Sequence, residues 1–245
     1  MSKLEYEVVI ISDTHLGSRG CQAKRLLNFL KSIKCKKLIL NGDIIDAWRL
    51  KKDFYFPPEH LDVVRYILKM ASKGTEVIYV TGNHDEFLRN VTDMDFSFSN
   101  IKVVDRYDLE IGGKKYLVMH GDMFDLIIQN HKWLAYVGDS LYGLLMRLNR
   151  FNNWTRHKLN LKRWSLSKHI KQKVKQASNY IGKFEKVATK YAQESGYDGI
   201  ICGHIHKPEY TLYDGIEYVN SGDWVEVCSA ITIKDKITAD CIIEV

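Results

Sequence analysis

Five short segments of the chain carry side chains that bind metal ions or transfer protons. Most of them directly follow an apolar run that predicts a buried strand, and an α/β sheet presents its chemistry at such strand ends. The segments are Asp13-Thr14-His15, Gly42-Asp43, Gly82-Asn83-His84-Asp85, His120-Gly121-Asp122 and Gly203-His204-Ile205-His206. Carboxylate, imidazole and amide groups in this combination point to a centre that holds two metal ions.

Such a centre suits the cleavage of phosphoesters and pyrophosphates. That reaction needs charge neutralised on the phosphate, a nucleophile at neutral pH and a proton for the leaving oxygen, and two metal ions about 3.5–4 Å apart supply the first two. A carboxylate can bridge both ions, because it has two oxygens and a full charge. His204 and His206 lie two apart in sequence, so in an extended segment they would share a face.

The order and spacing of the five segments resemble those of the calcineurin-like metallophosphoesterases, over about residues 6–232. That family has the pattern D-x-H, G-D, G-N-H-D, H-G-D and G-H-x-H, and all five elements are present here. The longer matches at 13–17, 41–46 and 203–208 resemble the branch that holds the UDP-2,3-diacylglucosamine hydrolases of lipid A synthesis. The best-known hydrolases of that branch have Arg at the position of His84, whereas His is ordinary for the superfamily.

The resemblance implies a ligand set for two divalent ions. One ion would be held by Asp13, His15, Asp43 and His206, and the other by Asp43, Asn83, His120 and His204. Asp43 would then bridge the pair. A mixture of imidazole, carboxylate and amide donors suits Mn²⁺, Fe or Zn²⁺, and the resemblance favours Mn²⁺.

His84 is not needed as a ligand once Asn83 is assigned. We expect its ring to bind the phosphoryl oxygen and to donate a proton to the leaving group, with Asp85 orienting the ring. A histidine that only supports Asn83 is the alternative. Asp46 either orients a ligand or caps the next segment, and the role of Asp122 is open in the same way.

The first half of the chain alternates predicted strands and helices. Strands at 6–12, 37–41 and 76–81 are separated by helices at 22–34 and 59–73, an order that implies parallel strands joined by right-handed crossovers. Gly112-Gly113 predicts a tight hairpin, and the tail from about 209 predicts short strands. Two face-to-face sheets flanked by helices fit this α/β mixture, and the resemblance implies a four-layer α-β-β-α sandwich.

Residues 124–195 interrupt this alternation, and we expect them to form a helical cap inserted into a core made of residues 1–123 and 196–245. Apolar residues recur in steps of three and four from Leu166 onward, which predicts one long amphipathic helix. Between 133 and 148 nearly every face of a helix would be apolar, so this part must be buried or meet lipid.

The charge of the chain is concentrated in this predicted cap. Residues 131–190 hold 14 Lys or Arg and two acids, so this segment has a net charge of +12. The whole chain has a net charge of +6, so the remaining residues together carry −6. We expect Arg156, Arg163 and Lys168 to meet a diphosphate or anionic lipid headgroups. A solvated basic hairpin is the plain alternative, and nucleic acid is a less favoured partner because a phosphate-tracking groove does not need so apolar a segment.

Bulk composition fits a single domain with an insertion. The chain has 245 residues, 45% of them hydrophobic and 27% charged. Its start lacks the layout of a signal peptide, and no stretch approaches ~20 uninterrupted apolar residues. The five cysteines form no C-x-x-C pair, so we expect reduced thiols in a cytoplasmic protein, with Cys202 and Cys228 packed in the core.

These observations predict a cytoplasmic two-metal phosphohydrolase that is peripheral on the anionic inner-membrane surface. By resemblance, its substrate is the nucleotide-linked glycolipid UDP-2,3-diacylglucosamine, which water would cleave to UMP and 2,3-diacylglucosamine 1-phosphate in lipid A biosynthesis. The alternatives are a soluble phosphodiesterase or nuclease of the same superfamily, and a metal-containing binding protein without turnover. The complete ligand set and His84 argue against the last of these.

Overall fold

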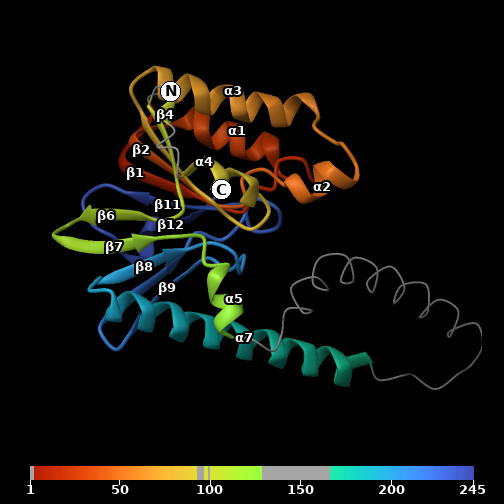
Figure 1. Cartoon of the computed structure of the whole chain (residues 1–245), viewed down its shortest axis with the longest axis vertical. Helices are drawn as coiled ribbons and strands as arrows, with labels where there is room; N and C mark the ends of the chain where they lie inside the picture. Colours follow the sequence, from red (N-terminus) through yellow and green to blue (C-terminus); the bar gives the residue numbers. More distant parts are fainter. Residues whose placement is uncertain (1–2, 93–96, 99, 129–165) are drawn as a thin grey trace, which may run out of the picture. The chain divides into compact units, whose positions relative to one another are not determined.

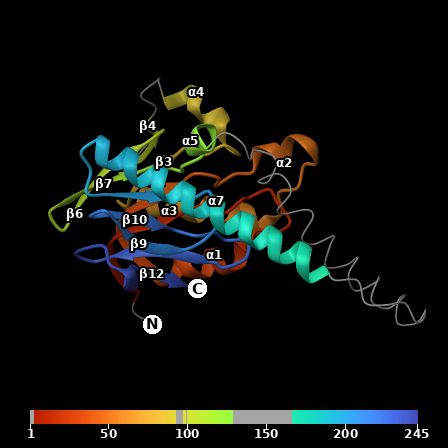
Figure 2. The same ribbon diagram turned by 90° about the horizontal axis from the view of Figure 1, so that it is seen from below.

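The computed structural model of the chain describes residues 3–92, 97, 98, 100–128 and 166–245 (Figures 1 and 2). It divides into two compact units, of which unit 1 comprises Met1–Asp122 and Ala188–Val245, and unit 2 comprises Met123–Val187. The cap at 124–195 remains a prediction from the sequence. Its central part, with Arg156 and Arg163, lies outside the described residues.

The predicted alternation of strands and helices in the first half is confirmed. The elements are β1 (Leu4–Ile11), α1 (Ala23–Ser32), β2 (Ile33–Asn41), α2 (Ala47–Lys52), α3 (Pro58–Ser72) and β3 (Glu76–Val80). The strands β1, β2 and β3 pair in parallel, with Val9 opposite Leu38 and Leu38 opposite Val77. The short helix α2 was not predicted from the sequence, because six residues are too few to show a helical period.

A seven-stranded mixed sheet is built around these strands. Its order is β12-β11-β1-β2-β3-β5-β4, with β4 at Ser97–Phe98, β5 at Ile101–Val104, β11 at Ser229–Ile233 and β12 at Ile242–Glu244. The strand β11 runs antiparallel to β1. The first and last parts of unit 1 therefore meet in one sheet.

A second sheet of five strands has the order β6-β7-β8-β10-β9. The bounds are β6 (Tyr107–Ile111), β7 (Lys114–Val118), β8 (Gly199–Cys202), β9 (Glu209–Tyr213) and β10 (Ile216–Asn220). The hairpin predicted at Gly112-Gly113 joins β6 and β7, and both glycines have positive φ angles. The strands β7, β8 and β10 pair in parallel, so their carboxyl ends share one edge.

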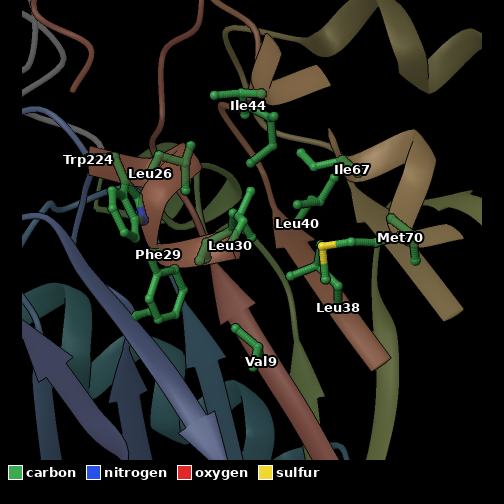
Figure 3. Close-up of a cluster of buried hydrophobic side chains, with 14 of the residues drawn as sticks. Val9, Leu26, Phe29, Leu30, Leu38, Leu40, Ile44, Ile67, Met70 and Trp224 are labelled. Carbon is green, nitrogen blue, oxygen red and sulfur yellow. The ribbon is translucent and has the colours of Figure 1, made fainter. Parts of the chain in front are cut away.

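Two apolar cores hold unit 1 together, and β1 contributes to both because its side chains alternate between faces. Val9 packs with residues of α1 and α3, such as Phe29 and Met70 (Figure 3). Ile10 packs with Val118 and other residues of the five-stranded sheet. The second core therefore joins two sheets face to face, which confirms the predicted α/β sandwich.

The five cysteines are free, as predicted, and Cys202 and Cys228 are fully buried. Cysteine thiols of this kind pack among apolar side chains as small hydrophobic groups. They take no part in the site described below.

Unit 2 contains α5 (Met123–Ile127) and most of α7 (Leu166–Glu194), the long helix predicted from the sequence. The two helices pack through Phe124 and Phe184, whose ring centroids lie 5.5 Å apart at nearly a right angle. The Tyr180 hydroxyl also donates a hydrogen bond to Asp125. Among the described helices of both units, none is long and apolar enough to span a bilayer.

Candidate metal centre

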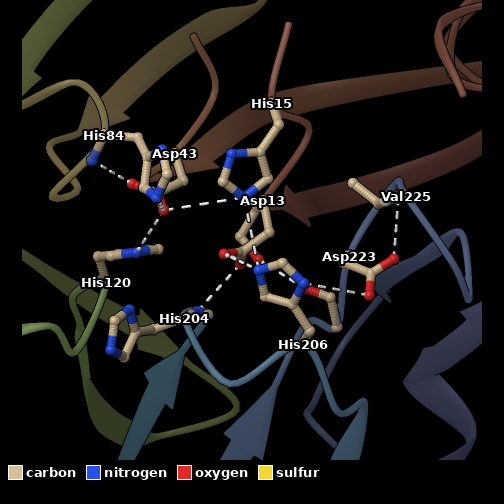
Figure 4. Close-up of polar contacts among 12 residues, drawn as sticks. Asp13, His15, Asp43, His84, His120, His204, His206, Asp223 and Val225 are labelled. Atoms are coloured by element: carbon tan, nitrogen blue, oxygen red, sulfur yellow. Dashed lines mark hydrogen bonds and ion pairs between the residues drawn. The ribbon is translucent and has the colours of Figure 1, made fainter. Parts of the chain in front are cut away.

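The predicted ligands gather at the carboxyl ends of strands from both sheets (Figure 4). Asp13 and His15 follow β1, Asp43 follows β2, Asn83 follows β3, His120 follows β7, and His204 and His206 follow β8. Parallel strands end at a common edge, and the two sheets face each other, so the seven side chains converge. Their roles as ligands remain predictions, and their positions are described next.

The loops that carry these side chains hold an unusual backbone conformation. Among the described residues, seven non-glycine residues have a positive φ, and five of them are predicted ligands: Asp13, His15, Asp43, His204 and His206. Each such residue costs of order 1–3 kcal/mol and keeps this conformation only where its surroundings enforce it. Here the Asp13 and His15 amides donate hydrogen bonds to the carbonyls of Gly42 and Asp43, so one motif enforces the conformation of the other.

The donor atoms assigned to the first ion lie close together. His15 Nε2 is 3.4 Å from His206 Nε2, and His206 Nε2 is 3.1 Å from Asp13 Oδ1. The fourth group, Asp43, places Oδ2 3.9 Å from His15 Nε2. An ion about 2.0–2.2 Å from each donor would leave neighbouring donors about 3–3.5 Å apart. The spacing therefore fits one shared cation.

The donors assigned to the second ion also converge on Asp43. Its Oδ2 lies 3.4 Å from His120 Nε2, and the rings of His120 and His204 have centroids 5.1 Å apart. Asp43 is thus within reach of both donor groups, as a bridging carboxylate must be, and Asp13 also lies close to donors of both. The groups Asp13, His15 and His206, and Asp13, Asp43 and His120, each bring their ligand atoms within 4.8 Å of one another.

Three of the predicted donor atoms lack hydrogen-bond partners. Asp13 Oδ1, Asn83 Oδ1 and His120 Nε2 are buried and make no well-formed hydrogen bond among the described residues. Asp13 Oδ1 and His120 Nε2 have only ion-pair neighbours, which are His206 Nε2 at 3.1 Å and Asp43 Oδ2 at 3.4 Å. A buried polar atom left unpaired costs about 1–3 kcal/mol, so native proteins rarely tolerate several in one place. Bound cations would satisfy all three, and the residues present therefore fit a dinuclear metal centre.

Outer contacts show which nitrogen faces the centre for two of the imidazoles. His120 Nδ1 lies 3.0 Å from the Asn41 carbonyl, which can only accept, so Nδ1 donates and Nε2 is the nitrogen left to face the centre. His206 Nδ1 lies 3.5 Å from Asp223 Oδ2. Sequence analysis missed Asp223, although Gly222-Asp223 follows an apolar strand just as Gly42-Asp43 does.

Asp46 does both things that the sequence left open. It caps α2 by accepting a hydrogen bond from the Arg49 amide at 3.0 Å. The same carboxylate lies 2.9 Å from His84 Nδ1 and 3.6 Å from His15 Nδ1. It therefore orients one predicted ligand and the predicted proton donor together. Asp122, whose role was also open, accepts a hydrogen bond from Arg89 at 2.8 Å.

The prediction that Asp85 orients the His84 ring is wrong. Asp85 is fully buried, and its carboxylate accepts hydrogen bonds from the amides of Ile44 and Gly82 and from the Tyr79 hydroxyl. Neighbouring side chains in a loop point in different directions, so adjacency in sequence does not bring Asp85 to the ring. Asp85 instead holds the two loops that carry Asp43 and His84 against each other.

The His84 ring is held on two sides. The Trp48 ring lies against it with centroids 4.4 Å apart and planes inclined at 33°, and Asp46 takes Nδ1. Nε2 then points toward the centre, 3.9 Å from Asp43 Oδ2, and the side chain is 25% exposed. Burial disfavours its charged form, but the hydrogen bond to Asp46 and the Asp43 charge outweigh burial and raise the pKa of His84. The arrangement favours a proton at Nε2.

Comparison with known proteins settles the family. The model of the calcineurin-like phosphoesterase family matches residues 6–208, which include all five motif segments. The chain belongs to this family. Its members are dinuclear metal-dependent enzymes, and the donor groups described above can hold such a centre. We therefore describe the chain as a metal-dependent hydrolase.

Relatives of this phosphoesterase have diverse names. It is 27% identical over 221 residues to a UDP-2,3-diacylglucosamine hydrolase of Neisseria meningitidis, covering 87% of this chain and 88% of that protein. It is 24% identical over 242 residues to the DNA polymerase II small subunit of Thermoplasma acidophilum, covering 89% of this chain but only 45% of the subunit. A solved Vps29 variant from Entamoeba histolytica has 16% identity, a TM-score of 0.44, and coverage of 93% of this chain and 86% of that one.

Glycines of the phosphoesterase motifs allow ligands from other motifs to approach. A Cβ on Gly42, whose φ is +78°, would lie 2.4 Å from the His120 ring. A Cβ on Gly203 would lie 2.5 Å from Asp13 Oδ2. In both cases the glycine and the ligand follow strands of different sheets.

We expect Gly42→Ala to displace His120 and to weaken metal binding by at least about tenfold, because moving a ligand or its support typically costs 10–100-fold in affinity. Isothermal titration calorimetry measures this affinity, with Mn²⁺ added to protein from which a chelator has removed the metal. Gly74→Ala is the matched control, since that glycine also has a positive φ but a Cβ there would meet no atom within 4 Å. Equal losses in the two variants would mean that backbone strain, and not the contact with His120, is responsible.

The stability of the metal-free phosphoesterase should fall as pH rises. Burial disfavours a charged His206, but Asp13 outweighs burial and raises its pKa to about 9. A histidine whose pKa is raised on folding stabilises fully below about pH 6.5, and this contribution is lost as pH rises through 9. The pKa of His120 is raised as well, by Asp43 and Asp13 against burial.

His206 is 38% exposed, so solvent screens its pairing, and we expect a loss of about 1–2 kcal/mol from His206 between pH 6.5 and 9.5. For a chain of this size that lowers Tm by about 3–6 °C. Differential scanning calorimetry of chelated and Mn²⁺-loaded protein tests this. The loaded protein should change less, because cations replace the protons. A Tm of the chelated protein that rose over this range would contradict the assignment.

Proposed function

We propose that this phosphoesterase cleaves the pyrophosphate of UDP-2,3-diacylglucosamine, giving UMP and 2,3-diacylglucosamine 1-phosphate in lipid A biosynthesis. The observation that carries its two-metal part is the group of buried donor atoms of Asp13, Asp43 and His120, which lie within 4.8 Å of one another and include two without a well-formed hydrogen bond. Bound cations would satisfy these donors. The Neisseria meningitidis relative, similar over nearly the whole of both chains, supplies the substrate class.

The side chains divide the work of hydrolysis among them. Two divalent ions, when bound, neutralise charge on the phosphate and lower the pKa of water. Asp13, His15 and His206 would hold one ion, and Asn83, His120 and His204 the other, with Asp43 shared. His84, held by Asp46 and Trp48, donates its Nε2 proton to the leaving phosphate oxygen. We propose Mn²⁺ as the metal, with Fe or Zn²⁺ compatible with the same donors.

The lipid half of the substrate requires a surface of its own. We propose that the basic, Leu-rich segment within 124–195 meets it, with Arg156 and Arg163 near the diphosphate. Both lie outside the described residues. Lys168 lies in α7, but its side chain is not described. Because a diacylated substrate lies in the membrane, we propose that the enzyme binds the inner membrane surface as a peripheral protein.

Hydrolysis of three substrates tests the proposal. The Mn²⁺-loaded enzyme should release UMP from UDP-2,3-diacylglucosamine, cleave UDP-N-acetylglucosamine far more slowly, and cleave bis-p-nitrophenyl phosphate slowly. A chelator should stop all three reactions. Thin-layer chromatography and absorbance measure the products. Equal rates on the acylated and non-acylated nucleotide sugars would contradict the proposed lipid substrate. If no substrate were hydrolysed in a metal-dependent way, the proposed two-metal hydrolysis would be contradicted.

A phosphodiesterase or nuclease acting on soluble substrates is the second candidate. The similarity to a DNA polymerase II small subunit over 89% of this chain favours it, as does the +12 charge of residues 131–190. A 5′-labelled single-stranded oligonucleotide with Mn²⁺ distinguishes the two. Cleavage of DNA that outpaced hydrolysis of the diacylated nucleotide sugar would favour the nuclease.

A further inference from the structure

The short helix α2, the loop after it and Arg19 of the loop after β1 form an exposed surface of mixed character. We call it the α2 surface and define it by five residues: Arg19, Arg49, Lys51, Lys52 and Phe54. Phe54 is 80% exposed, the most exposed large hydrophobic side chain of the described residues. In Figures 1 and 2, α2 (orange) lies at an edge of unit 1, away from the strands.

The cations of the α2 surface are poorly compensated. Arg49, Lys51 and Lys52 are exposed, and the described residues offer them no ion pair. Arg19 lies 3.7 Å from Asp53, but both side chains are more than 70% exposed, so the pair is weak. Four cations and one carboxylate leave a net charge of +3 on the α2 surface, which also carries the exposed phenyl ring of Phe54.

Further contacts tie the loop to this surface and the helix to the centre. The Arg19 guanidinium lies over the Tyr55 ring, 4.5 Å from its centroid, which anchors the loop on one side of Phe54. At the other end, Asp46 caps α2, and Trp48 lies against His84. Trp48 of α2 therefore contacts the predicted proton donor, while Arg49, Lys51 and Lys52 of the same helix are exposed to solvent.

We propose that the α2 surface docks on an anionic lipid bilayer. Each Lys or Arg near such a surface adds about 1 kcal/mol of attraction, and insertion of an exposed phenyl ring at the headgroup boundary removes its apolar area from water. A nucleic acid would match the charge but would leave Phe54 without a role. Docking through a helix that touches His84 would bring the centre to the membrane plane. This purpose rests on the proposed function, but the binding itself does not.

Sedimentation with vesicles tests the proposal without any turnover. The full chain, loaded with Mn²⁺, is mixed with vesicles of phosphatidylcholine alone or of phosphatidylcholine and phosphatidylglycerol in equal parts. We expect binding to the anionic vesicles only. Phe54→Ser should weaken the partition coefficient by about tenfold, and the double variant Lys51→Gln/Lys52→Gln by about thirtyfold.

Matched controls lie elsewhere on unit 1. Leu212→Ser removes another exposed apolar side chain, on β9, and Lys31→Gln/Lys69→Gln removes two exposed lysines from α1 and α3. Both should bind vesicles as the wild type does. The rate on bis-p-nitrophenyl phosphate should be unchanged in all four variants, which shows that the centre is intact.

The outcomes separate this inference from the proposed function. If the target and control variants lost vesicle binding to the same extent, the proposed docking role of the α2 surface would be wrong. It would also be wrong if the Lys51→Gln/Lys52→Gln variant lost binding and the Phe54→Ser variant did not. Absence of vesicle binding beside active hydrolysis of the diacylated nucleotide sugar would also overturn it, and would leave the function standing. Vesicle binding that depends on Phe54, without that hydrolysis, would support the surface and contradict the substrate.

Discussion

Asp43→Ala should abolish hydrolysis and lower the metal content at both sites. The reason is geometric: Asp43 Oδ2 lies 3.4 Å from His120 Nε2 and 3.9 Å from His15 Nε2, one nitrogen from each predicted donor group. Removing it leaves both groups without their shared carboxylate and leaves buried histidines without a compensating charge. We expect fewer than one ion per chain by plasma mass spectrometry, and a rate on bis-p-nitrophenyl phosphate indistinguishable from that without enzyme.

Asp43 also supports the backbone, so the variant needs controls. Its Oδ1 accepts a hydrogen bond from the His84 amide at 2.8 Å. Asp43→Asn retains that acceptor while it removes the charge, so it should fold and still fail to bridge. Asp62→Ala, an exposed carboxylate on α3, should leave metal content and rate unchanged. Near-normal turnover of Asp43→Asn with two ions bound would remove the bridging role.

His84→Ala should lower kcat by about 10²–10⁴, the usual worth of a positioned acid or base. Metal content should survive, because Asn83 and not His84 is assigned as a ligand. The loss should be smaller for aryl phosphodiesters with acidic leaving groups, which depart without a proton. A series of substituted phenyl esters measures this as a steeper dependence of log kcat on the leaving-group pKa in the variant.

His84→Arg separates proton donation from simple charge. Arginine binds a phosphoryl oxygen, but its pKa is too high for it to give up a proton at neutral pH. If His84 is the acid, the Arg variant should restore KM but not the rate on poor leaving groups. Full recovery of kcat with arginine would contradict proton donation and would leave a purely electrostatic role. Arginine is the residue that the resembling hydrolases carry here, so either result bears on how the branch works.

The sequence predicted what depends on local pattern. Asp13, Asp43 and His204 could be placed together because each follows a buried strand, and parallel strands converge at their carboxyl ends. The Asp46–His84 contact could not be predicted, since it depends on how two loops cross in space. Asp85 is the neighbour of His84 in sequence, and that adjacency predicts the wrong partner for the ring.

Other features of the site leave too weak a trace in sequence. The contact of Trp48 with His84 depends on a helix of six residues, shorter than any periodicity can reveal. The positive φ angles at Asp13 and His15 follow from hydrogen bonds to the second motif, not from residue type, although Asp and His tolerate that conformation better than most. Asp223 alone had a usable signal, as a Gly-Asp pair after a strand.

The close contacts of Gly42 with His120 and of Gly203 with Asp13 have a consequence for folding kinetics. Each joins a loop of the seven-stranded sheet to a loop of the five-stranded sheet, and the partners are distant along the chain. Contacts of such long sequence separation form late. Neither sheet alone carries a complete ligand set, so a refolding chain should take up Mn²⁺ only after the sheets dock. Metal uptake, followed by stopped flow, should lag behind the recovery of secondary structure. The ions would then bind last and hold the two sheets together after each has formed.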